Sequence, residues 1–328
     1  MLPEPSLGTR ASRARTPIIL SIALALTVVA CSQSVNPSPT ASPTPTLQPT
    51  PTLIPSPTPT PLPTPEPLNS RLLDHRFTVL LVGEDQSAAR QARGYLGDNT
   101  DSLMVVSVSP RQKRVVMLSL PRDTVNIPLV NGQLWTGKVN AIANSYGIDA
   151  LREAMGTLLN IRIPYYVKVN MDDFVDVVDA VGGISVKVKT YVQEPRWGLY
   201  LNPGRVHLNG RTALYFSRAR HFDSDYARAA RQQQVIHVLA LKYTNRKTDI
   251  DVRRLLRTLA GMETNLPMGD LPTLTELARR AARADYVSQV LMPPQFSLGY
   301  GDFQDGRGWV IIPNIEAMRH QVRLLFGN

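Results

Sequence analysis

The sequence contains a single cysteine, Cys31, among its 328 residues. One cysteine cannot form an intramolecular disulfide, so the fold must be stabilised by its hydrophobic core. The five histidines do not have the short spacings of zinc ligands, and no pair of thiols accompanies them. These shortages exclude a disulfide-rich scaffold and a conventional zinc site.

Acidic residues are also few, because 26 Asp and Glu face 36 Lys and Arg and give a formal net charge of +10. This excess favours an anionic partner, and nucleic acid, phospholipid head groups and phosphorylated glycans all satisfy it. Aromatic residues make up only 6% of the chain and are not interleaved with the basic ones. A nucleic-acid-binding protein is therefore not favoured.

The first part of the chain, residues 1–31, has the layout of an export signal. Three arginines lie within residues 10–15, and the apolar run at residues 17–30 is too short to span a membrane comfortably. The run ends in VVAC at residues 28–31, which resembles the lipobox of a bacterial lipoprotein. That resemblance implies a lipidated Cys31 at the mature N-terminus. The alternative is an uncleaved signal anchor, and both place the remaining chain outside the cytoplasmic membrane.

A linker rich in Pro, Thr and Ser follows at residues 32–69. Proline fixes φ and lacks an N–H group, so the linker is expected to be extended and without a core. At roughly 3.1 Å per residue its contour is on the order of 100 Å. It is therefore expected to hold a domain formed by residues 70–328 away from the membrane, within reach of the cell wall.

Strand and helix patterns alternate through residues 70–328. Continuous apolar runs predict buried strands at residues 77–83, 102–108 and 115–120. Four further strands are expected at residues 165–169, 184–188, 286–292 and 308–312. Helices are expected at residues 138–160 with an interruption near Gly147, and at 172–181, 250–260, 273–284 and 314–326, whereas 190–209 reads as a loop. This alternation favours an α/β fold, a three-layer α-β-α sandwich with a central mixed sheet.

Charged residues lie at the ends of the first three predicted strands. Asp85 follows the first strand, Asp101 precedes the second, and Arg122 follows the third. Ligands of open α/β sheets bind at strand ends, and proteins hold Mg²⁺ with one or two carboxylates. We therefore expect Asp85 and Asp101 to bind Mg²⁺ or Mn²⁺ if their strands are adjacent. Each acid taken alone is also typical of a turn or a helix cap.

The segment with the most chemistry is residues 214–234, LYFSRARHFDSDYARAARQQQ. Alternation at residues 215–219 predicts a strand that carries Arg218 and Arg220 on one face, beside Phe216.

A helix is then expected to begin near Ser224 or Asp225, with Arg228 and Arg231 on one face. Guanidinium groups bind phosphate in a bidentate manner, so these arginines are expected to converge on a diphosphate or a similar anion. The alternative is a solvated basic helix with ordinary surface ion pairs.

The order of these segments resembles the LytR-CpsA-Psr family of cell-wall enzymes. The resemblance runs from about residue 77 to 243, more weakly to the end, and is carried by FTVLLVGEDQ, NTDSLMVVSVSP, VVMLSLPRDT, GKVNAIA, DAVGGISVKV, LNGRTALYFSRAR and DYARAARQQQ. It implies a phosphotransferase at the outer face of the cytoplasmic membrane, which moves an anionic glycopolymer from undecaprenyl diphosphate to peptidoglycan. It also implies an apolar cavity for the polyprenyl chain, with arginines and Mg²⁺ at its diphosphate.

Position by position, the resemblance assigns metal binding to Asp85 and Asp101. It assigns diphosphate binding to Arg122, Arg218, Arg220, Arg228 and Gln232, to which we add Arg231 and Lys138. Some members have an arginine where this chain has Asn99, and Arg90 or Arg93 is a candidate to replace it.

The implied reaction is attack by a sugar hydroxyl on the phosphorus nearest the transferred glycan. Cationic side chains would neutralise the charge that develops as undecaprenyl phosphate leaves. Asp225 is the expected general base. Asp123 is the second candidate, because an acid directly after Arg122 can serve simply to hold that arginine in place. Phe216 is expected at the apolar mouth where the lipid tail leaves the charged group. Two other functions remain open, namely a lipid-diphosphate phosphohydrolase, and a lipoprotein that binds wall polymer or polyprenyl phosphate without catalysis.

Overall fold

The structure is a computed structural model that describes residues 67–95, 99–221, 223–244 and 250–327. The predicted export signal with Cys31, and the linker as far as residue 66, lie outside the described residues. Among the helices in the described part of the chain, none combines the length and hydropathy needed to cross a bilayer.

A six-stranded mixed sheet forms the centre, with the strand order β11-β6-β1-β2-β3-β12. Its strands are β1 (Phe77–Glu84), β2 (Thr100–Ser109), β3 (Arg114–Leu120), β6 (Tyr165–Val169), β11 (Glu263–Thr264) and β12 (Asp285–Val290). β2 runs antiparallel to both β1 and β3, whereas β6 is parallel to β1 and β12 is parallel to β3. The three continuous apolar runs therefore became neighbouring central strands, and the predicted mixed sheet is confirmed.

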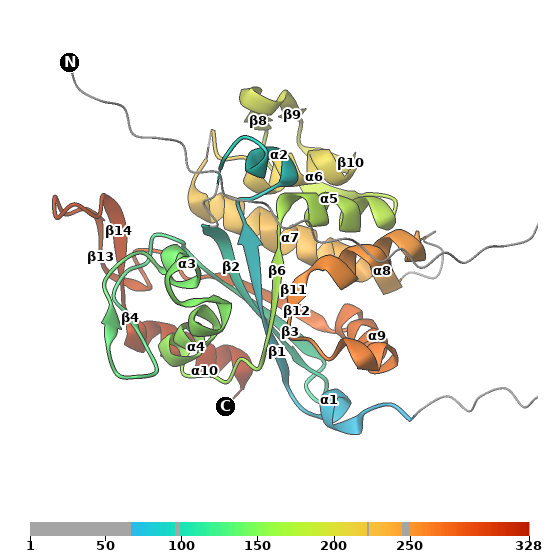
Figure 1. The fold of residues 1–328 in the computed structure, drawn as a ribbon, viewed down its shortest axis with the longest axis horizontal. Helices are drawn as coiled ribbons and strands as arrows, with labels where there is room; N and C mark the ends of the chain where they lie inside the picture. Colours follow the sequence, from blue (N-terminus) through green and yellow to red (C-terminus); the bar gives the residue numbers. More distant parts are fainter. Residues whose placement is uncertain (1–66, 96–98, 222, 245–249, 328) are drawn as a thin grey trace, which may run out of the picture. The chain divides into compact units, whose positions relative to one another are not determined.

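Helices cover both faces of this sheet (Figure 1). One face carries α3 (Ile142–Tyr146), α4 (Ile148–Leu159) and α10 (Ile315–Phe326), and the other carries α1 (Ser70–Asp74), α7 (Asp225–Thr244) and α9 (Leu271–Ala282). Successive strand residues point to opposite faces, so both faces of the apolar strands are buried. The predicted three-layer α-β-α sandwich is confirmed.

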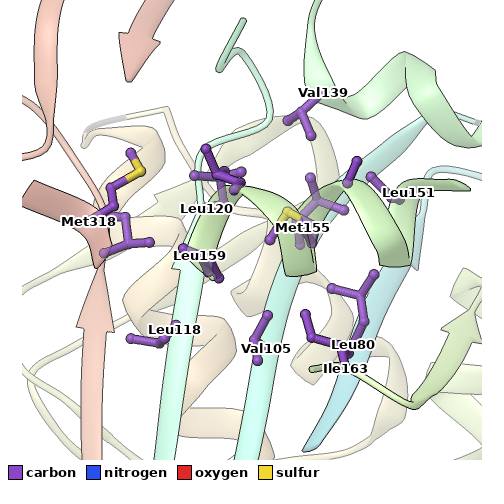
Figure 2. Close-up of a cluster of buried hydrophobic side chains, with 14 of the residues drawn as sticks. Leu80, Val105, Leu118, Leu120, Val139, Leu151, Met155, Leu159, Ile163 and Met318 are labelled. Atoms are coloured by element: carbon purple, nitrogen blue, oxygen red, sulfur yellow. The ribbon is translucent and has the colours of Figure 1, made fainter. Parts of the chain in front are cut away.

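The core between α4 and the sheet is made of aliphatic side chains (Figure 2). Met155 and Leu159 of α4 face Leu80, Val105 and Leu118 of β1, β2 and β3, and all five are at most 1% exposed. Burial of each such side chain stabilises the fold by roughly 1.5–3 kcal/mol. This core fixes the positions of the strand ends from which the candidate site is built.

A second core packs against the far side of α7. It is formed by α5 (Met171–Ala180), α6 (Gly210–Arg218), α8 (Val252–Gly261) and the paired strands β7 (Ile184–Val188) and β10 (Gly204–Leu208). The loop expected at residues 190–209 is wrong, because β8 (Val192–Glu194), β9 (Leu199–Leu201) and β10 occupy most of it. The remaining α-helix and strands are α2 (Ala88–Gln91), β4 (Ile127–Pro128), β5 (Leu134–Trp135), β13 (Ser297–Asp302) and β14 (Trp309–Pro313).

The strand expected at residues 215–219 is also wrong, because these residues end helix α6. Asn209 caps that helix by accepting a hydrogen bond from the Thr212 amide at 2.9 Å. Gly210 lets α6 approach α5, since a Cβ at this position would lie 2.3 Å from the carbonyl oxygen of Val175. Arg218 is the last helical residue and Arg220 follows the cap, so the two do not share the face of a strand.

Candidate active site: a cavity with a charged end and an apolar end

A cavity of about 900 Å³ lies between the ends of β1 and β2 and the helices α5, α6, α7 and α8. One part is apolar and is lined by Met104, Phe174, Val177, Leu214, Val235, Ile236, Leu239, Leu259 and Met262. The other part is charged and is lined by Asp85, Arg90, Asp101, Arg122, Arg218, Arg220, Arg228 and Gln232. The cavity therefore joins a surface suited to an anion to a surface suited to a hydrocarbon chain.

Asp85 anchors two arginines at the charged end. Arg218 donates to its carboxylate at 2.6 Å, and the guanidinium of Arg90 lies 3.3 Å from the same group. Arg218 also lies over the ring of Trp197, 5.0 Å from its centroid. These contacts hold the Arg218 guanidinium at the cavity wall. Arg218 lies at the end of a helix and not on the strand that the sequence predicted.

A second charged pair joins β2 to the segment after β3. Arg122 donates to Asp101 at 2.8 Å, and its Nε lies 3.6 Å from the Asp123 carboxylate. Burial lowers the pKa of Arg122, but the charge and hydrogen bond of Asp101, followed by the charges of Asp123 and Asp225, outweigh this effect and leave that pKa raised. Arg122 is therefore held as a cation in the centre of the site.

Arg228 and Arg220 share the carboxylate of Asp225, at 3.2 Å and 3.9 Å. Arg228 is only 8% exposed. Burial is the main cause that lowers the pKa of Arg228, and the nearby charge of Arg122 acts in the same direction. An anion bound here would therefore meet a poorly hydrated guanidinium, which strengthens their attraction.

Gln232 connects the helices to the sheet. Its side-chain oxygen accepts a hydrogen bond from the Ser102 hydroxyl at 2.9 Å, and its amide donates to the carbonyl of Ser217 at 3.3 Å. It lines the cavity one turn after Arg228. Arg228 and Gln232 thus face the cavity from successive turns of α7, and Asp225 pairs with Arg228 from the turn before.

A second cavity of about 620 Å³ adjoins the first and shares Asp85, Asp101 and Arg122 with it. It is otherwise lined by polar or small residues, namely Asn99, Asp123, Gly137, Lys138, Asn140, Ala141 and Arg307. The Lys138 ammonium donates to Asp123 at 2.7 Å. Lys138, predicted among the diphosphate-binding residues, therefore lines this second cavity and not the larger one.

A divalent metal is compatible with the acids that the two cavities share. In the described part of the chain, no three or more His, Cys, Asp and Glu side chains gather to hold a metal by themselves. Mg²⁺ usually takes only one or two protein carboxylates and completes its shell with water and phosphate oxygens. Asp85 and Asp101 fit that need, because Asp85 follows β1, Asp101 lies at the start of the adjacent antiparallel β2, and their side chains are 23% and 31% exposed.

Two residues of the predicted site lie elsewhere. Arg231 does not line either cavity, because its guanidinium binds Asp223 and donates to the backbone carbonyls of Phe216 and Ala219. Phe216 is 1% exposed within the second core and is not at a cavity mouth. Both corrections follow from the helical form of residues 215–218, which turns this segment toward α7.

Arg90 and Arg93 are the two candidates to replace the arginine that some family members have at the position of Asn99. Arg90 lines the larger cavity, whereas Arg93 is exposed and lines neither. Two side chains at the site had no signal in the sequence. Glu194 accepts a hydrogen bond from the backbone amide of Arg220 at 3.3 Å, and Arg307 reaches the second cavity from the loop between β13 and β14.

The model of the LytR_cpsA_psr family matches residues 62–317. The chain is 32% identical over 260 residues to the polyisoprenyl-teichoic acid–peptidoglycan teichoic acid transferase TagU of Enterococcus faecalis, which covers 76% of this chain and 78% of TagU. It is 28% identical over 261 residues to Biofilm regulatory protein A of Streptococcus mutans, covering 76% of this chain and 63% of that protein.

Among solved structures, the crystal structure of Bacillus subtilis TagV matches with a TM-score of 0.59 and 26% identity, covering 77% of this chain and 98% of TagV. The chain spans between 50% and 63% of the length of the first curated relatives that it matches. The family match includes the strand ends, the arginines and the acids described above. This chain therefore belongs to the LytR_cpsA_psr (LytR-CpsA-Psr) family.

Proposed function

We propose that this protein transfers an anionic glycopolymer from a polyprenyl diphosphate carrier, such as undecaprenyl diphosphate, to peptidoglycan. The main observation behind the proposal is that one continuous cavity has both an arginine-lined end and an apolar end. A polyprenyl diphosphate is divided in the same way, into a charged group and a hydrocarbon tail. The name of the Enterococcus faecalis relative, which describes transfer of a polyisoprenyl-linked polymer to peptidoglycan, supports the same reaction.

In this proposal the diphosphate occupies the charged end. Arg122, Arg218, Arg220 and Arg228 each pair with a carboxylate that the diphosphate oxygens would replace or share. Bidentate contacts from several guanidinium groups suit a group with many oxygens. The lipid tail would then run along the apolar wall, where Phe174 and Leu239 lie.

The reaction forms one P–O bond and breaks another. The oxygen of a peptidoglycan hydroxyl attacks the phosphorus that carries the glycan. The bond between that phosphorus and the bridging oxygen of the lipid-side phosphate breaks. The electron pair leaves with polyprenyl phosphate, and the hydroxyl proton passes to a carboxylate. The arginines oppose the negative charge that develops on the phosphate oxygens, which is the main means of catalysis in phosphoryl transfer.

Asp123 is better placed than Asp225 to accept that proton. Asp123 lines the second cavity beside Lys138, whereas Asp225 lines neither cavity and orients Arg228 and Arg220. This reverses the order expected from the sequence. Asp85 and Asp101 would hold a Mg²⁺ or Mn²⁺ ion, which supplies further positive charge to the diphosphate when bound.

The proposed location is the outer face of the cytoplasmic membrane, facing the cell wall. A lipid-anchored Cys31 and the Pro-rich linker at residues 32–69 would keep the domain near both the carrier and the wall. The positive charge of the chain suits a wall polymer that is anionic.

Product analysis separates transfer from hydrolysis and from simple binding. The purified protein would be incubated with Mg²⁺, a lipid-diphosphate-linked glycan labelled in its sugar, and peptidoglycan. We expect label to become covalently attached to peptidoglycan as polyprenyl phosphate is released. Release of free phosphorylated glycan without attachment would instead show a phosphohydrolase.

Binding without catalysis makes a different prediction for the acids. A binding protein needs only the arginines, so a protein with both Asp85→Asn and Asp101→Asn would keep its full function. We expect this double variant to lose transfer. A wild-type protein that retains the lipid donor without consuming it would contradict the proposed reaction.

A further inference from the structure

The β13–β14 hairpin is attached directly to the catalytic segment after β3. The Ile311 amide of β14 donates to the Asp123 carbonyl at 3.0 Å, and the Val125 amide donates to the Ile311 carbonyl at 2.9 Å. In the hairpin loop, Arg307 lines the second cavity and donates to the Thr136 carbonyl at 3.2 Å. The hairpin therefore forms a continuation of the wall of the second cavity.

This hairpin exposes aromatic rings to solvent. Tyr300 is 52% exposed and Trp309 is 44% exposed, and their ring centroids lie 6.3 Å apart. Exposed apolar side chains that lie side by side are typical of a binding surface, whereas single exposed rings need no explanation.

The charges around the rings indicate which partner fits. Asp302 lies on the same strand as Tyr300, and Asp305 in the hairpin loop is paired with Arg307 at 2.5 Å. Carboxylates repel anionic lipid head groups and an anionic polymer, and they accept hydrogen bonds from sugar hydroxyls. Aromatic faces pack against the C–H faces of sugar rings. An uncharged stretch of an amino-sugar glycan satisfies both features.

The geometry of phosphoryl transfer also favours the second cavity as the place where the acceptor binds. The attacking and leaving oxygens lie roughly in line through the phosphorus. In the proposed reaction the leaving group extends into the apolar cavity lined by α5, α7 and α8. The acceptor must then approach from outside the apolar cavity, and the second cavity reaches the same Arg122 and Asp101 through residues that the first does not contain.

We propose that the second cavity, together with the rings of Tyr300 and Trp309, binds the acceptor as a glycan strand of alternating N-acetylated amino sugars. This inference rests on the proposed transfer and specifies its acceptor site. Tyr300 and Trp309 hold the strand by stacking, and Arg307 and Lys138 bind its hydroxyl and acetamido oxygens. The hydroxyl that reacts is thereby directed to the side of the phosphorus that faces Asp123.

The test measures glycan binding separately from transfer. The full chain would be titrated calorimetrically with a soluble tetrasaccharide of alternating N-acetylglucosamine and N-acetylmuramic acid whose lactyl carboxyl groups are converted to amides, so that the glycan carries no charge. Because each ring would lose its face-to-face contact with one sugar, we expect Tyr300→Ala and Trp309→Ala each to raise Kd about tenfold, which corresponds to about 1.4 kcal/mol. Trp309→Phe keeps a ring and should retain most of the affinity. Tyr200→Ala is the matched control, because Tyr200 is 56% exposed on β9 and lines neither cavity.

In the transfer assay, the same hairpin variants should raise KM for the glycan acceptor and leave KM for the lipid donor unchanged. An unaltered Kd for the tetrasaccharide in both alanine variants, or no binding by the wild-type protein, would overturn the inference. A raised KM for the donor would assign the hairpin to the transferred polymer. Loss of binding to anionic phospholipid vesicles, with glycan binding intact, would assign it to the membrane.

The two proposals fail in different ways. A protein that binds the tetrasaccharide through Tyr300 and Trp309 but neither binds nor consumes a lipid diphosphate would refute the transfer and keep the glycan site. A protein that transfers label to peptidoglycan with the hairpin variants unimpaired would keep the transfer and refute the glycan site.

Discussion

The guanidinium of Arg218 donates to the carboxylate of Asp85 at 2.6 Å, although 133 positions separate the two residues in the sequence. Arg218 ends helix α6 of the second core, and Asp85 follows strand β1 of the central sheet. The charged end of the cavity is therefore assembled only when the two cores pack together. Its arginines are held in place by paired carboxylates, which would reduce the reorganisation needed for the proposed transfer.

Replacement of Arg218 by alanine should lower transfer of glycan to peptidoglycan by about 10²-fold, as loss of one preorganised donor does in other enzymes. Arg218→Lys should recover only part of this rate, because an ammonium group cannot bind phosphate with two parallel hydrogen bonds. Initial rates with a lipid-diphosphate-linked donor measure both effects. Arg93→Ala is the control, because Arg93 is exposed and lines neither cavity. Full activity of Arg218→Ala would remove this residue from the site.

A large side chain at Leu259 should obstruct the apolar end of the cavity. Leu259 on α8 lines the cavity, whereas Leu256 on the same helix is 46% exposed and does not. We expect Leu259→Trp to weaken binding of a donor with a long polyprenyl chain by at least about tenfold, since several buried CH₂ groups contribute about 0.8 kcal/mol each. Binding of a donor with a very short chain should change little.

Direct titration with donors of both lengths checks this expectation, with Leu256→Trp as the matched variant. If Leu259→Trp weakened both donors equally, the apolar wall would not be the tail site. If Leu256→Trp had the same effect, a general disturbance of α8 would explain the loss.

The central sheet could be predicted from the sequence because its strands are continuous apolar runs with polar ends. The predicted limits of β6 and β7 agree with the structure at both ends, and the interruption of the helical segment at Gly147 is observed between α3 and α4. In these segments, local pattern and tertiary packing require the same conformation.

Helix α6 could not be predicted from its local sequence pattern. Its Arg-x-Arg end has the period of a strand, and the Asn209 cap lies outside the segment that carries this pattern. The contact between Gly210 and α5 decides the conformation, and a single sequence does not show that contact. The hairpin residue Arg307 is a similar case, because only the packing of β14 against residues 123–125 brings it to the cavity.

The corrected position of Arg231 leads to a prediction about stability. Its buried guanidinium binds Asp223 and the carbonyls of Phe216 and Ala219, so it joins α7 to the end of α6. Removal of one partner from a buried ion pair typically destabilises a protein by about 3–5 kcal/mol. Because Asp223 is partly exposed, we expect Arg231→Ala to lower the free energy of unfolding by about 3 kcal/mol.

Urea unfolding measures this loss, with the exposed Arg253→Ala as the control. The folded fraction of Arg231→Ala should still bind the lipid donor with an affinity close to that of the wild type. Loss of donor binding without loss of stability would return Arg231 to the diphosphate site.

His237 should make stability depend on pH below neutrality. Its ring stacks on Tyr286 at a centroid distance of 3.8 Å, between α7 and β12, and burial lowers its pKa from the ordinary value of 6.5. The unfolded chain therefore binds a proton at a higher pH than the folded chain. The resulting stabilisation is present above pH 6.5 and is lost as the pH falls through the lower folded pKa.

Tyr286 should act at the opposite end of the pH range. Burial raises its pKa from 10.0 to about 12, so its contribution is present below pH 10.0 and is lost as the pH rises toward about 12. His237→Phe keeps a ring on Tyr286 but cannot be protonated, so it should flatten the loss of stability on the acidic side alone. Tyr286→Phe should flatten only the alkaline side. Urea unfolding of both variants across the pH range checks this, and an unchanged acidic slope in His237→Phe would show that other groups bind the proton that opposes folding.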